Sequence, residues 1–139
     1  MVEEELKKAP KDRKFHMMYL ITKHDGLPLK ELAELKIPKF IHFSITSLGS
    51  TKYEPGVMKA DDLLDRIEEF IKQKVLNPNL VTIRIDPIIP GVTKKEDVEH
   101  IIKRAVSMGI HTFKFSVMDS YGYTQQGVRT TNSKDRFII

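Results

Sequence analysis

The 139 residues include no cysteine. This excludes disulfides, thiolate zinc sites, a cysteine nucleophile and any iron–sulfur cluster ligated by this chain alone. The chain also lacks an apolar run that approaches the roughly 20 residues of a membrane span. Its charged start, MVEEELKKAPKDRK, is not followed by the apolar core of a signal peptide. We therefore expect a cytoplasmic protein without a membrane association.

The composition, 40% hydrophobic and 30% charged, suits one globular domain. We expect that domain over residues 15–122, between a charged N-terminal tail (1–14) and a polar C-terminal tail (123–139). The net charge of +4 permits a nucleic-acid partner but does not by itself indicate one.

Strand-like runs alternate with helical periodicity along the domain. The strands are expected at 15–22, 40–49, 80–89 and 111–119, and the helices at 27–35, at 61–75 and after residue 93. Thr93 and Glu96 have the spacing of a capping box at the start of the last helix, and Gly109 is placed to end it. Alternating strands and helices predict parallel βα units.

Period-two alternation gives three of the strands one apolar and one polar face. In residues 41–46, for example, Ile41, Phe43 and Ile45 alternate with polar side chains. A doubly wound sheet is covered on both faces and would be apolar on both. We therefore predict an α/β fold, a partial (βα) barrel of four parallel strands with helices on the outer face and the polar face lining a hollow.

Several polar side chains should converge in that hollow. They are Ser44, Thr46, Arg84, Asp86, Lys114 and Ser116. A guanidinium presents a donor fork to a carboxylate or phosphate, and sites in parallel βα folds lie at the carboxyl ends of the strands. We accordingly expect a binding site for an anionic small molecule or nucleotide there.

Structural roles explain the same residues. Arg84 and Asp86 can form a partly buried pair that neutralises itself, and Lys114 can extend to solvent. His42 on the same face is more typical of a hydrogen-bonded strand histidine than of a ligand. Glu96 and His100 have helical i, i+4 spacing, which fits a solvated face better than a metal site.

Three segments carry a family resemblance: FSITSLGSTKYEPGV (43–57), VTIRIDPIIPGVT (81–93) and FKFSVMDSYG (113–122). Together they resemble the carboxyl-side half of the radical S-adenosylmethionine (SAM) barrel, in particular the spore photoproduct lyase-like, or DNA repair photolyase-like, proteins. The resemblance covers about residues 16–122. It implies that the four strands are the third to sixth of a six-stranded partial barrel.

The resemblance also implies a cofactor and a site. Members hold a [4Fe–4S] cluster through three cysteines and bind SAM across the strand tips, with a Ser or Thr of the fourth strand and an Arg of the fifth strand on its carboxylate or ribose. In this sequence those positions are Ser44 or Thr46 and Arg84, and Glu54 lies in the turn that follows the fourth strand. SAM is thus the implied cofactor.

Since the chain has no cysteine, the resemblance implies a cysteine-free half barrel, inactive alone. We expect its two bare sheet edges to pair with a copy of itself or with a complementing segment or chain. Two other functions stay open, a non-catalytic binding module and a nucleic-acid-associated protein. The second would use Tyr121, Tyr123, Arg129 and Arg136 for stacking and phosphate contacts.

Overall fold

A computed structural model describes residues 16–24 and 29–118. The expected tails, 1–14 and 123–139, lie outside the described residues, as do the tyrosines and arginines of the nucleic-acid hypothesis. The domain boundaries therefore stay a prediction.

The described chain alternates strands and helices as the sequence predicts. Its elements are β1 (Met18–Thr22), α2 (Leu29–Glu34), β2 (Lys39–Ser44), α3 (Ala60–Lys72), the 3-10 helix η1 (Pro78–Leu80), β3 (Val81–Ile88), α4 (Lys95–Ser107) and β4 (Thr112–Val117). Each observed strand overlaps its predicted range: β1, β3 and β4 lie within theirs, whereas β2 begins one residue earlier than predicted and ends five residues earlier.

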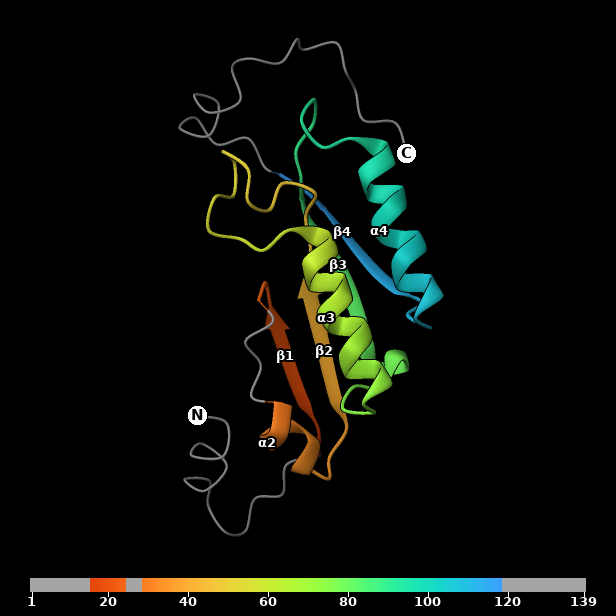
Figure 1. The fold of residues 1–139 in the computed structure, drawn as a ribbon. Helices are drawn as coiled ribbons and strands as arrows, with labels where there is room; N and C mark the ends of the chain where they lie inside the picture. Colours follow the sequence, from red (N-terminus) through yellow and green to blue (C-terminus); the bar gives the residue numbers. More distant parts are fainter. Residues whose placement is uncertain (1–15, 25–28, 119–139) are drawn as a thin grey trace.

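The four strands form one sheet in the order β1-β2-β3-β4, and all three neighbouring pairs are parallel. Figure 1 shows α3 and α4 side by side on the same side of this sheet. This confirms the α/β class and the four parallel strands with helices on one face.

The hydrophobic core lies between the helices and that face. The alternating strand residues Ile41, Phe43 and Ile83 are fully buried in one cluster with Ile67 of α3 and Ile101 of α4. The other face of the sheet carries the polar alternation. A parallel sheet with α3 and α4 on the same face agrees with a partial barrel rather than a doubly wound sheet.

The apolar face is incompletely covered at β4. Phe115 is the register partner of the buried Ile85 and Val117 that of the buried Ile88, yet Phe115 and Val117 are 50% and 55% exposed. The reason is the place of β4 at the edge of the sheet. Helix α4, which precedes β4, contributes Val98, Ile101 and Ala105 to the core, and within the described residues no helix follows β4.

The ends of α4 confirm one prediction and correct another. Gly109 (φ +88°) follows the helix, and the amides of Gly109 and Ile110 donate to the carbonyls of Val106 and Ala105, which is a Schellman motif. The predicted capping box is wrong. The N-cap residue is Lys94, and no side chain forms a capping hydrogen bond there. The Thr93 hydroxyl instead accepts a hydrogen bond from the backbone amide of Ile89 at 2.9 Å.

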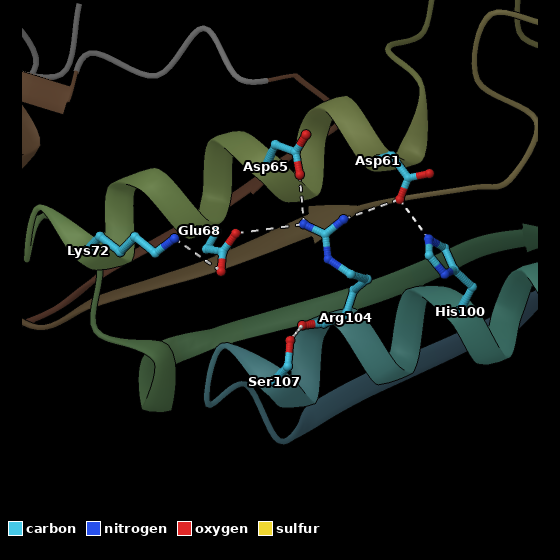
Figure 2. Close-up of polar contacts among 7 residues, drawn as sticks. All are labelled: Asp61, Asp65, Glu68, Lys72, His100, Arg104 and Ser107. Atoms are coloured by element: carbon cyan, nitrogen blue, oxygen red, sulfur yellow. Dashed lines mark hydrogen bonds and ion pairs between the residues drawn. The ribbon is translucent and has the colours of Figure 1, made fainter.

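A polar network joins the exposed sides of α3 and α4 (Figure 2). Arg104 of α4 lies 2.7 Å from Asp65 and 3.8 Å from Glu68, and His100 lies 2.7 Å from Asp61. Asp65 raises the pKa of the Arg104 guanidinium further above its ordinary value, so this side chain stays charged. His100 thus serves as a contact between helices, in agreement with the solvated-face interpretation.

Candidate functional site

A polar row crosses three consecutive strands. Ser44 of β2 is the register partner of Arg84 in β3, and Arg84 is the partner of Lys114 in β4. Partners in parallel strands share a face and lie about 4.8 Å apart. Ser44 as a residue is 3% exposed, Arg84 is partly buried and Lys114 is exposed. Three of the predicted site residues are therefore brought together on the polar face.

Asp86 lies on the same face as Arg84, two residues further along β3. Nη2 of Arg84 donates to Oδ2 of Asp86 at 2.8 Å, so the neutralising pair that the sequence left open is formed. Both side chains keep exposure, 26% for Arg84 and 29% for Asp86. The pair is thus accessible, and an anion can approach the guanidinium from the solvent side.

A second row of register partners crosses the same face two residues nearer the amino ends of the strands, and it contains His42. Its register partners are Ile21 in β1 and Thr82 in β3. His42 is 6% exposed as a residue, and its Nδ1 lies 2.9 Å from the hydroxyl of Tyr19. The two rings also contact each other, with centroids 4.5 Å apart. His42 is therefore hydrogen-bonded, as the structural reading of the sequence expected.

The electrostatics tie His42 to the polar row. Burial lowers the pKa of His42 from its ordinary value of 6.5, and the charges of Lys114 and Arg84 lower it further. The imidazole is consequently neutral at neutral pH. The role of Tyr19 was missed, because its contact with a residue 23 positions away leaves no periodic signal in the sequence.

Thr46 and Glu54 form a separate contact at the carboxyl end of β2. The Thr46 hydroxyl donates to one oxygen of Glu54, and the Lys23 ammonium lies 2.9 Å from the other. Gly49 pairs with Glu54 in an isolated parallel bridge. The carboxylate of Glu54 therefore fastens the loop after β2 to the segment after β1, which is a structural task.

Ser116 extends the polar face along β4, two residues beyond Lys114, and it is exposed at the sheet edge. Ser47, in the loop after β2, has a buried hydroxyl oxygen without a hydrogen-bond partner among the described residues. It was not predicted, since its position outside the strand gives no alternation to interpret.

One depression of about 190 Å³ lies away from these residues. It is lined by Ile37, Lys39, Lys74, Leu76, Leu80 and Val81, at the amino ends of β2 and β3. The polar row lies further toward the carboxyl ends. We place the candidate site on the polar face, because the convergent cationic and hydroxyl groups are there.

The residues present do not fit an iron–sulfur cluster, because the chain supplies no cysteine thiolate. Among the described residues, no three His, Asp or Glu side chains are grouped so that they could hold a metal ion. They do fit the carboxylate or ribose of a SAM-like molecule, for which a guanidinium, an ammonium and a hydroxyl are suitable donors. In the described part of the chain, no helix is long and apolar enough to cross a membrane.

The comparisons with known proteins agree with a distant radical SAM relation. The chain is 28% identical over 58 residues to the radical SAM Nalpha-GlyT isomerase of Pseudomonas phage M6. The match covers 42% of this chain and 11% of that protein's length. No protein-family model matches the chain, and no solved structure matches it. Fold and match together define the class as an α/β protein with a partial likeness to a radical SAM protein.

Proposed function

We propose that this chain is the carboxyl-side half of a radical-SAM-like barrel of the DNA repair photolyase-like kind. The polar row of Ser44, Arg84 and Lys114 on a one-sided parallel sheet is the observation that carries the proposal. The 58-residue match to a phage radical SAM protein supports it. A cytoplasmic place is part of the proposal.

In this proposal the chain is inactive alone, since a [4Fe–4S] cluster needs thiolates that it does not contain. A cysteine-bearing segment or second chain completes the barrel along a sheet edge. SAM, when bound, supplies the chemistry of the complete barrel. This chain's contribution is to bind and orient it, with the Arg84 guanidinium on the carboxylate and the Ser44 hydroxyl beside it.

Ligand binding by this chain tests the proposal directly. We expect SAM to bind the wild type in isothermal titration calorimetry and Arg84→Ala to weaken it about tenfold or more, because a charge-assisted hydrogen bond contributes about 1.5–3 kcal/mol. The matched control is Arg66→Ala on the exposed side of α3, which should leave the affinity unchanged. Equal binding by wild type and Arg84→Ala removes Arg84 from the site, and no binding of SAM contradicts the cofactor assignment.

A second candidate function is a binding module without catalysis. The absence of cysteine favours it, as does the exposed Lys114, which suits a more strongly anionic ligand than SAM. A third, nucleic-acid association through Tyr121, Tyr123, Arg129 and Arg136, lies outside the described residues. It requires an affinity that falls as salt rises, because phosphate contacts release counterions.

A further inference from the structure

The two ends of the polar face differ in chemistry. On β1, Tyr19 and Ile21 alternate onto this face and are 52% and 49% exposed, although both are large and apolar. Ile21 is the register partner of His42, which fixes the face on which they lie. The β1 end is therefore an aromatic and aliphatic surface beside the buried imidazole.

The aromatic ring of Tyr19 is held in place. Its hydroxyl is hydrogen-bonded to Nδ1 of His42 at 2.9 Å, and the imidazole packs against the ring. A tyrosine restrained at both its ring and its hydroxyl loses little further freedom when a planar group stacks on its exposed side. Stacking of a base on such a ring is favourable and tolerant of the kind of base.

The β3–β4 end is positively charged at Lys114. Arg84 and Lys114 are register partners. Arg84 is paired with Asp86 at 2.8 Å, whereas within the described part of the chain Lys114 forms no ion pair with a carboxylate. The charge of both residues reaches His42, which lies between this end and Tyr19. Ser44 and His42 offer hydrogen-bonding groups between the aromatic end and the cationic end.

We propose that this face binds a nucleoside phosphate in one orientation across the strands, with the base stacked on Tyr19 and the phosphates at Arg84 and Lys114. Two strand spacings, from β1 to β3, are on the order of 10 Å. That distance is comparable to the separation between the base and the terminal phosphate of a nucleoside diphosphate. The sugar then lies over His42 and Ser44.

Charge distinguishes this ligand class from SAM. ADP and SAM both contain an adenosyl group. SAM also carries a cationic sulfonium and an ammonium besides its carboxylate, whereas the diphosphate group of ADP is purely anionic. The ammonium of Lys114 favours the phosphates, and Arg84 adds guanidinium donors whose charge Asp86 partly offsets. The inference rests on the proposed function in one respect only, that the polar face is a ligand site.

The test uses ADP, adenosine and SAM as calorimetric probes on the full chain. We expect ADP to bind the wild type more tightly than SAM or adenosine does. Tyr19→Leu should weaken ADP about tenfold, while Tyr19→Phe, which keeps the ring, should weaken it by less than threefold. Lys114→Gln should lower the affinity for ADP about tenfold and leave the affinity for adenosine unchanged. The control Lys103→Gln on α4 should change neither affinity.

The outcomes separate the two proposals. If Lys114→Gln weakens ADP but Tyr19→Leu does not, the base does not lie on β1 and the inference is overturned, while the ligand site stands. Tighter binding of SAM than of ADP also overturns it and favours the SAM assignment. If the wild type binds none of the three probes, the polar face is not a site and both proposals fail. If an oligonucleotide binds far more tightly than ADP, the inference is overturned and the ligand of this face is a nucleic acid. Far-UV circular dichroism of each variant verifies the fold.

Discussion

His42 lies on the polar face of an inner strand, nearly covered by its surroundings. The hydroxyl of Tyr19 is hydrogen-bonded to one of its ring nitrogens, and the cations Arg84 and Lys114 lie on its other side. Protonation would place a further positive charge in this buried, already cationic place. The folded state therefore holds the neutral imidazole.

This makes stability depend on pH with a definite sign. Because the pKa of His42 is lower in the folded state than its ordinary 6.5, the unfolded chain takes up the proton first as the pH falls. The stabilisation by neutral His42 is complete above pH 6.5 and decreases as the pH drops below it toward the folded-state pKa. We expect the difference in unfolding free energy between wild type and His42→Gln to shrink from pH 7.5 to 5.5.

Urea unfolding at each pH measures this difference. The variant Lys114→Gln removes one of the charges that lower the pKa, so the His42 resonance in an NMR titration should move toward a higher midpoint. An unchanged midpoint would show that the Lys114 charge does not reach the imidazole.

At the scale of elements, the path of the loop after β2 depends on a close approach between the backbone at Gly49 and the backbone at Met58. A Cβ on Gly49 would lie 2.0 Å from the carbonyl oxygen of Met58, at the far end of the loop. The same loop carries Glu54, which Thr46 and Lys23 contact. Glycine at position 49 thus allows the loop to fold back and present Glu54.

Substitution of this glycine should be costly. Gly49→Ala must displace the Met58 backbone, and we expect it to lower the unfolding free energy by at least about 2 kcal/mol. Gly56→Ala, in the same loop but with nothing within 4 Å of the added Cβ, is the control and should stay within about 0.5 kcal/mol of wild type. Chemical denaturation measures both. Similar stabilities of the two variants would contradict the close approach.

At the scale of the whole molecule, β1 and β4 form the two edges of the described sheet. Edge strands present unpaired backbone groups, and β4 adds the half-exposed Phe115 and Val117. We therefore propose pairing with another copy or with a complementing chain along these edges.

Light scattering at high micromolar concentration tests this association, and we expect a mass above that of the 16.1 kDa monomer. Val117→Lys places a charge at the β4 edge and should shift the equilibrium toward the monomer at least severalfold, whereas Gln73→Lys beyond α3 should not. A wild type that stays monomeric at this concentration would refute the pairing of copies.

The sequence by itself determined the class of fold and the membership of the polar face. Alternation with a period of two is a local property, so it assigned Ser44, Arg84 and Lys114 to one face before their registers were known. The helical stripes and Gly109 were local signals too. These predictions agree with the observed elements.

The tertiary structure alone decided which polar groups meet. Strand register and loop path determine three contacts: the hydrogen bond of Tyr19 with His42, the ion pair of Lys23 with Glu54, and the hydrogen bond of Thr93 with Ile89 in place of a helix cap. The half-exposed Phe115 and Val117 depend on the position of β4 at the edge. Periodicity states on which face a side chain lies, but its neighbours in space come from strand pairing and packing, which bring distant parts of the chain together.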